Sequence, residues 1–271
     1  MKKLIPAAAA VCAAAVFCSC SKPAEKAETP AAPEAPAAKT FTVGFDAEFP
    51  PYGYKDGEEY KGFDLDLARE VCKRKGWTFV AKPIDWDAKD AELDSGSIDC
   101  IWNGFTMQGR EGQYAWTAAY VDNSQVVMVA ADSAVAKLAD LAGKTVAVQT
   151  DTPVQKALQG QDEEKPEAAA LGKTFKQIVV TATYNNAVME LESGAVDAVA
   201  LDIGVAKQKM ADKAGKFKML DEIVMKETYG IGFKKGNDAL AAEVWAVYQA
   251  MLADGTVDKL AAQYKIDGVI K

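Results

Sequence analysis

Charged and polar side chains stand just after apolar runs that are typical of β-strands, and their types suit the binding of a zwitterion. Arg110 offers a guanidinium group, which can grip a carboxylate through two parallel hydrogen bonds. Asp202 offers a carboxylate that can accept hydrogen bonds from an ammonium group. Phe49 and Trp86 can enclose the rest of such a ligand between apolar faces. These residues predict a site for a small molecule that carries both a carboxylate and an ammonium group.

The composition excludes several other kinds of chemistry. The chain has 271 residues, with 31 Lys plus Arg against 39 Asp plus Glu and a formal net charge of -8. This balance argues against nucleic acid as a partner, because sequence-independent affinity for phosphate backbones comes from clustered Lys and Arg. The chain has no His, which excludes an imidazole base, nucleophile or metal ligand. We expect no metal and no cofactor.

Strands and helices alternate along the chain from residue 41 onward. One helix is expected at 64–75, with Asp64 as its N-cap and Gly76 in the left-handed position after its end. This alternation predicts an α/β fold, in which ligands bind beyond the carboxyl ends of the strands. The apolar runs that we interpret as strands lie at 41–45, 77–81, 98–102, 125–130, 145–148, 177–182 and 196–201.

A weak internal repeat indicates two similar lobes. Each copy is typical of a helix that ends at a Gly and leads into a buried strand. Chance similarity between two such junctions is the alternative. The first copy is Leu93, Ser95, Gly96, Ile98, Asp99 and Ile101, and the second is Leu191, Ser193, Gly194, Val196, Asp197 and Val199.

Residues 1–19 are typical of a signal peptide for export. Lys2 and Lys3 precede an apolar run at 4–17, which has the length of a signal-peptide core and is too short to span a membrane. The run ends in FCSCS at 17–21, which resembles a bacterial lipobox with Cys20 as the lipidated residue. We expect a palmitate-bearing lipoprotein, anchored to the membrane on the periplasmic or cell-surface side. Ordinary cleavage and release is the alternative.

Residues 20–40 are expected to be the lipidated Cys and a disordered tether. The segment is rich in Pro, Ala and Glu and has no large apolar side chain. It therefore cannot bury enough surface to offset the entropy of ordering.

The sequence GFDLDLA at 62–68, with Val71 and Cys72 after it, resembles the signature of the family 3 extracellular solute-binding proteins. The resemblance extends over residues 41–271, including the stretches 103–110 and 184–202. It implies a two-lobed periplasmic-binding-protein fold of type II, with a ligand cleft between lobes that two hinge strands join. Lobe one would comprise residues 41–122 plus 227–271, and lobe two residues 123–226.

The resemblance also implies a function. Members of the family are receptors that capture polar amino acids and deliver them to the permease of an ABC transporter. We therefore expect a monomeric binding protein and not an enzyme. A ligand-sensing subunit of a membrane signalling protein is one alternative. A periplasmic dehydratase on the same fold is another, with Asp46 or Asp151 as its general acid.

The family pattern assigns roles to particular positions. Arg110 matches the residue that binds the ligand α-carboxylate, assisted by the N–H of Thr106. Asp202 matches the residue that binds the α-ammonium group, assisted by the carbonyl of Gly104. Asp46 matches a position that meets the ligand side chain. The full set expected to bind ligand is Asp46, Phe49, Trp86, Asn103, Gly104, Thr106, Arg110, Thr152 and Asp202.

The residues themselves leave other roles open. Arg110 could lie at the surface, and Asp202 could be a helix N-cap. Asp46 could cap a turn instead of meeting a ligand. Phe49 and Trp86 could be core residues, as we expect Trp102 and Phe105 to be.

Two departures from the family pattern affect the carboxylate subsite. Only three residues separate Thr106 from Arg110, one fewer than is usual. Pro153 replaces a residue that normally offers its N–H to the carboxylate, although Thr152 can still cap the helix that Pro153 begins. Asp151 would repel an anion, so we expect it to point outward unless the ligand carries positive charge.

The side chain of the ligand is less closely specified. Asp46 with Phe49 and Trp86 favours a neutral polar amino acid such as glutamine, and a cationic amino acid comes next. The absence of a second obvious basic residue in the cleft argues against an acidic ligand. Cys72 and Cys100 have apolar neighbours, which favours two buried thiols over a disulfide, although export permits one.

Overall fold

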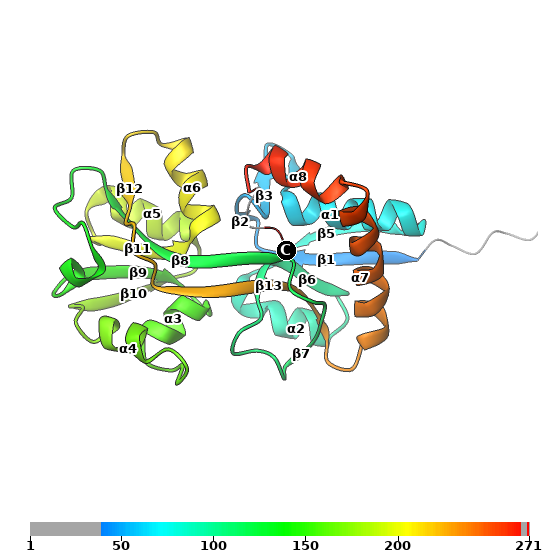
Figure 1. Ribbon diagram of the computed structural model, residues 1–271, viewed down its shortest axis with the longest axis horizontal. Coiled ribbons are helices and arrows are strands. Elements are labelled where there is room, and N and C mark those ends of the chain that lie inside the picture. Colours follow the sequence, from blue (N-terminus) through cyan, green and yellow to red (C-terminus); the bar gives the residue numbers. More distant parts are fainter. Residues whose placement is uncertain (1–38, 267–269, 271) are drawn as a thin grey trace, which may run out of the picture. The chain divides into compact units, whose positions relative to one another are not determined.

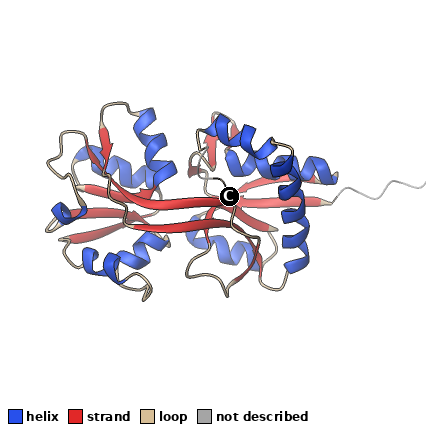
Figure 2. Cartoon of the chain, in the orientation of Figure 1, coloured by secondary structure: helices blue, strands red, loops and turns tan. Residues whose placement is uncertain are grey.

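The computed structural model describes residues 39–266 and residue 270. The expected signal peptide, Cys20 and nearly all of the expected tether lie outside the described residues. Within them, strands form a ten-stranded sheet and a three-stranded sheet with helices packed around them (Figures 1 and 2). None of the described helices is long and apolar enough to cross a membrane.

Lobe one is built on parallel strands. β1 (Thr40–Phe45) lies between β5 (Thr78–Pro83) and β6 (Cys100–Thr106) and is parallel to both. Helices α1 (Phe63–Lys75), α7 (Asp238–Ala253) and α8 (Thr256–Tyr264) pack together, and α2 (Lys89–Asp94) packs on β1 and β6. The smaller elements are β2 (Glu48–Phe49), β3 (Gly53–Asp56), β4 (Glu59–Lys61), the 3-10 helix η1 (Trp86–Ala88) and β7 (Tyr114–Trp116).

Lobe two repeats this plan. β9 (Thr145–Gln149) lies between β10 (Gln177–Thr181) and β11 (Ala198–Asp202) and is parallel to both. Helix α5 (Tyr184–Ser193) packs on this sheet, and α3 (Pro153–Leu158) contacts both β9 and α4 (Pro166–Gly172). The remaining elements are the 3-10 helix η2 (Leu138–Leu141), α6 (Ile203–Asp212) and β12 (Phe217–Met219).

Two long strands join the lobes. β8 (Val121–Ala130) and β13 (Met225–Lys234) pair antiparallel through their first halves, from Val121 opposite Tyr229 to Gln125 opposite Met225. β8 continues the sheet to β11, whereas β13 continues it to β6, where Tyr229 lies opposite Thr106. The strand order β10-β9-β11-β8-β13-β6-β1-β5 therefore runs through both lobes (Figure 1).

The structure confirms the α/β alternation and the repeated junction. Gly96 and Gly194 have φ of 76° and 75°, and each follows a helix that leads to a buried strand, β6 or β11. Gly76 ends α1 in the left-handed conformation, as predicted. Cys72 and Cys100 are buried free thiols in this structure.

The N-cap prediction for Asp64 is wrong. Gly62 occupies the N-cap position, and Asp64 lies in the first turn of α1 with its side chain fully buried. Its Oδ2 accepts hydrogen bonds from the backbone N–H of Gly104, at 2.6 Å, and from the hydroxyl of Tyr120, at 2.8 Å. A tertiary contact thus replaces the local cap, and it holds the backbone of β6 in place.

Candidate functional site

All nine residues that were predicted to bind ligand line one pocket between the lobes. The space between its lining atoms, open solvent included, is about 300 Å³. Lobe one supplies the ends of β1 and β6 with β2 and η1, and lobe two supplies the ends of β9 and β11. The lining residues are Asp46, Phe49, Trp86, Asn103, Gly104, Thr106, Arg110, Gln149, Thr152, Pro153 and Asp202.

Arg110 is buried at 4% exposure, which excludes the surface alternative. Its Nη1 donates to the carbonyl of Thr106 at 3.2 Å, and its Nη2 donates to the carbonyl of Asp151 at 2.6 Å. The turn at 107–110 is closed by a hydrogen bond from the N–H of Arg110 to the carbonyl of Met107. The shortened spacing therefore still brings the guanidinium group back over the end of β6.

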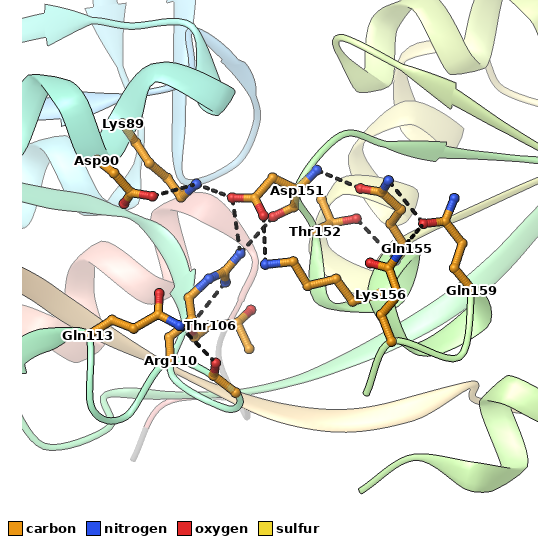
Figure 3. Close-up of polar contacts among 12 residues, drawn as sticks. Lys89, Asp90, Thr106, Arg110, Gln113, Asp151, Thr152, Gln155, Lys156 and Gln159 are labelled. Atoms are coloured by element: carbon orange, nitrogen blue, oxygen red, sulfur yellow. Dashed lines mark hydrogen bonds and ion pairs between the residues drawn. The ribbon is translucent and has the colours of Figure 1, made fainter. Parts of the chain in front are cut away.

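Asp151 does not point outward, so of our two expectations for it only the one of a positively charged ligand stays open. Its carboxylate accepts hydrogen bonds from Lys89 of lobe one and from Lys156, at 2.7 Å, and its Oδ2 lies 3.8 Å from Nη2 of Arg110 (Figure 3). Burial acts to raise the pKa of Asp151, but the contacts with Lys156, Lys89 and Arg110 outweigh it and hold the pKa at about 2. An anion from lobe two is thus paired with cations of lobe one.

Lys89 contacts Asp151 beside the pocket but was not among the predicted residues. It stands on α2, three positions after Trp86, and its side chain is 1% exposed. Burial lowers the pKa of Lys89, and the hydrogen bond that its ammonium group donates to Asp151 opposes that shift. The cleft region therefore has a second basic residue, contrary to our expectation, but its charge is paired with Asp151 and it does not line the pocket.

Asp202 ends β11 as a buried acceptor. Its Oδ1 accepts hydrogen bonds from Asn123 at 2.7 Å, from Gln125 at 2.9 Å and from the hydroxyl of Tyr229. Its Oδ2 accepts from the hydroxyl of Tyr184 at 3.1 Å. Asp202 occupies the N-cap position of α6, yet its side chain makes no capping hydrogen bond. Its carboxylate is therefore held by side chains of β8, β13 and α5 and does not cap the helix.

Asp46 caps a turn and also lines the pocket. Its Oδ1 accepts from the N–H of Glu48 at 2.8 Å, which caps the turn after β1. Its Oδ2 accepts from Nε2 of Gln149, in lobe two, at 2.7 Å. Asp46 is buried and forms no salt bridge with any described residue. Burial raises the pKa of its carboxyl group. The pocket therefore contains a carboxylate with spare acceptor capacity.

The remaining residues shape the walls of the pocket. Phe49 packs against Tyr52 and Tyr184, with ring centroids 5.7 Å and 5.9 Å away. Trp86 is half-buried and packs edge-to-face on Phe105 at 5.5 Å. Both rings contact the core and also line the pocket.

The lobe-two helix at the pocket forms as predicted. Thr152 is the N-cap of α3 and Pro153 is at its first position, so the missing N–H leaves no helical hydrogen bond unmade. The Thr152 hydroxyl donates to the carbonyl of Gln149 at 2.8 Å. Gln149, which was outside the predicted set, is the neighbour whose side chain reaches across to lobe one.

Gly104 has φ of 55°, and a Cβ there would come within 2.8 Å of Phe49 and 3.0 Å of Tyr229. We predict that Gly104→Ala lowers the free energy of unfolding by about 2–4 kcal/mol, because backbone strain adds to a clash in the pocket wall. Gly109→Ala is the matched control, since its φ is 74° but no atom lies within 4 Å of the added Cβ. Urea unfolding of both variants measures the difference, and equal losses would contradict the close packing at Gly104.

The chain is similar to known binding proteins over most of its length. Residues 41–267 match the bacterial extracellular solute-binding proteins, family 3. The chain belongs to this family.

Two kinds of relative illustrate the match. The ABC transporter arginine-binding protein 1 of Escherichia coli (strain K12) is 27% identical over 236 residues, covering 85% of this chain and 92% of that protein. An ABC uptake transporter substrate-binding protein from Streptococcus pneumoniae with bound histidine superposes with a TM-score of 0.79 at 27% identity, covering 86% of this chain and 94% of that one. An ancestral arginine-binding protein bound to glutamine superposes with a TM-score of 0.74 at 31% identity, covering 84% of this chain and 98% of that one.

Proposed function

We propose that the pocket between the lobes captures a free α-amino acid and that the protein delivers it to an ABC transporter permease for uptake. The observation that carries this proposal is the placement of Arg110 and Asp202 on opposite lobes of one small pocket. In the proposed complex, Arg110 and the N–H of Thr106 hold the α-carboxylate. Asp202 and the carbonyl of Gly104 hold the α-ammonium group, and the ligand thereby joins the lobes.

The relatives support the transport role and the binding role over catalysis. Those compared above are an arginine-binding protein of an ABC transporter and binding proteins with bound histidine or glutamine. Closure around an amino acid would give a permease a surface that the open protein lacks, because only the liganded form holds both lobes together. We place the lobe boundaries at 122/123 and 226/227, within β8 and β13, and propose that the protein acts as a monomer.

We further propose that lipidation of Cys20 and a tether at 21–40 hold the binding protein at the membrane after removal of residues 1–19. The support is the lipobox-like FCSCS at 17–21. Mass spectrometry of the membrane fraction should show a diacylglyceryl-modified chain, and Cys20→Ala should release the protein to the soluble fraction. An unmodified Cys20 would contradict the anchor.

The proposed ligand has a side chain that donates hydrogen bonds, as in glutamine or arginine. Asp46 offers acceptor capacity at the pocket, which suits either a neutral polar or a cationic donor. A larger hollow shares Asp46 and Trp86 with the pocket and adds acidic side chains at its rim. This charge adds weight to the cationic class. The acidic residues that line the hollow are Asp46, Glu48, Asp85, Asp87 and Glu92.

A thermal-shift screen of residues 39–271 against the twenty amino acids and cystine tests this proposal. A ligand at about 100 times its Kd stabilises the folded state by about 2.7 kcal/mol, which raises the unfolding midpoint. We expect a rise with one or a few polar amino acids. No rise with any amino acid, for protein refolded from denaturant to remove bound ligand, would contradict the proposal.

The pair Lys89–Asp151 joins the lobes and should therefore contribute to closure. We predict that Asp151→Asn weakens binding of every amino acid about tenfold or more, because the closed form would contain a buried Lys89 without its anion. Lys156→Gln is the matched control, since that partner of Asp151 is 41% exposed and belongs to the same lobe. Isothermal titration calorimetry measures both, and equal affinities of the two variants would contradict the interlobe role.

A further inference from the structure

Glu227 is a buried acid on the strand that joins the lobes. It belongs to β13, is 3% exposed and lies opposite Asn123 of β8 in the ladder. Nδ2 of Asn123 donates to Oε1 of Glu227 at 2.6 Å, and Nε2 of Gln125 donates to the same oxygen at 2.7 Å. These two amide groups also donate to Oδ1 of Asp202. One pair of donors thus bridges two carboxyl groups.

Two carboxyl groups so close cannot both be ionised at small cost. Neither Glu227 nor Asp202 forms a salt bridge to any described residue, and both are buried. When like charges share a dry site, one of the two groups retains its proton. The hydroxyl groups of Tyr184 and Tyr229 donate hydrogen bonds to the carboxylate oxygens of Asp202 and stabilise its ionised form. They therefore favour Asp202 as the ionised member of the pair and Glu227 as the protonated one.

The electrostatics agree with this geometry. Burial raises the pKa of Glu227 to about 8, and the charge of Asp202 adds to the effect. Burial also raises the pKa of Asp202, but hydrogen bonds from Tyr229, Glu227 and Tyr184 oppose that rise. Glu227 is therefore the group that holds the proton. The other titratable groups around the pair are Tyr52, Tyr184 and Tyr229 inside the protein and Asp122, Lys165 and Lys226 at the adjoining surface hollow.

We propose that Glu227 is a positioning residue of the ammonium subsite: a neutral carboxylic acid that donates its proton to Asp202 and fixes that carboxylate from the joining strand β13. The inference rests on the proposed amino-acid function for its consequence, though not for the proton itself. A protonated Glu227 leaves a single negative charge at the subsite, which matches the single positive charge of an α-ammonium group. Because Glu227 and Asn123 belong to β13 and β8, this network also connects Asp202 to the two strands that join the lobes.

The proton can be tested without any ligand. Carboxyl carbon NMR of the ligand-free protein, with Glu227→Gln to assign the signal, should show Glu227 titrating near pH 8. In the unfolded chain this group titrates near pH 4.3, so the folded form binds more protons between these values and loses stability as pH rises. The free energy of unfolding should fall from pH 5 to pH 9 more steeply in wild type than in Glu227→Gln. A Glu227 signal that titrates below pH 5 would overturn the proposal.

The positioning role is tested with L-arginine, L-histidine and L-glutamine as probes. Gln can replace the acid O–H with an N–H donor, so Glu227→Gln should keep the wild-type Kd within about threefold at pH 7. Between pH 7 and 9 its Kd should change less than that of wild type, since only the titration of the ligand's own ammonium group remains. Glu227→Leu cannot donate and should weaken binding at least tenfold, with far-UV circular dichroism as the check on folding. Equal losses in both variants would overturn the positioning role. If neither these probes nor any other amino acid of the thermal-shift screen binds wild type, the proposed function fails, while the ligand-free titration still decides the state of Glu227.

Discussion

Replacing Arg110 by Ala should weaken the binding of every α-amino acid by a similar factor, whatever its side chain. Arg110 is buried at the end of β6, and in the proposed complex it forms the main contact with the α-carboxylate. Removing one partner of a buried, hydrogen-bonded charge pair costs about 2–5 kcal/mol, or roughly 30-fold or more in Kd. Isothermal titration calorimetry with the amino acids found by the thermal-shift screen measures the effect.

Two further variants make the Arg110 test specific. Arg110→Lys keeps the charge but not the planar fork, so it should bind with intermediate affinity. Arg69→Ala removes an Arg that is 47% exposed on α1 and should leave Kd unchanged. An Arg110→Ala protein that binds as tightly as Arg69→Ala would remove Arg110 from the site.

Replacing Asp202 by Asn should have a comparable effect, through the other end of the ligand. Asn has nearly the same shape but no charge, so the ammonium group would lose its anion in a buried pocket. We expect a loss of about 2–5 kcal/mol, or roughly 30-fold or more in Kd. Calorimetry with an amino acid and with the corresponding acid that lacks the α-ammonium group isolates this contact. The Kd of the second ligand should be nearly the same in wild type and in Asp202→Asn, because that ligand has no ammonium group to contact Asp202.

The control for Asp202 is Asp197→Asn. Asp197 precedes the same strand, β11, but its side chain is 41% exposed and pairs with Lys144 at the surface. This variant should bind like wild type. If Asp202→Asn weakened both ligands equally, its effect would be structural and the ammonium assignment would be wrong.

Much of the fold could be predicted because it depends on local patterns. Gly76 could be placed after α1 since a helix followed by Gly favours a left-handed end. The strand β1 could be placed since its apolar residues form a short run before a polar loop. The polar residues that follow such strands, Arg110 and Asp202 among them, could then be proposed as ligand-binding residues, because ligands bind beyond the carboxyl ends of strands in α/β folds.

The remaining features depend on contacts between distant parts of the chain. Asp64 follows the local rule for a cap, but its buried position beside the N–H of Gly104 determines its role. Lys89 and Asp151 are 62 residues apart and meet only because the lobes bring them together. Each is an ordinary surface residue by sequence, so neither its burial nor its pairing could be predicted.

β13 was not among the predicted strands for a related reason. Its polar residues, such as Glu227, interrupt the apolar pattern that predicts a buried strand. The structure shows that Glu227 is buried against two amide donors from β8. The burial of an acidic side chain can be predicted only when its hydrogen-bond partners are known, because burying an unpaired charge costs much free energy.

The central claim is that one pocket recognises both charged ends of an amino acid, and a three-ligand titration tests it most directly. The ligands are the amino acid with the largest thermal shift, its methyl ester, which lacks the carboxylate charge, and its deaminated acid, which lacks the ammonium group. We predict measurable binding of the amino acid and at least a 30-fold loss for each of the other two, since each deletes one buried charge contact of about 2–5 kcal/mol. Equal binding of all three would contradict the assignment of Arg110 and Asp202.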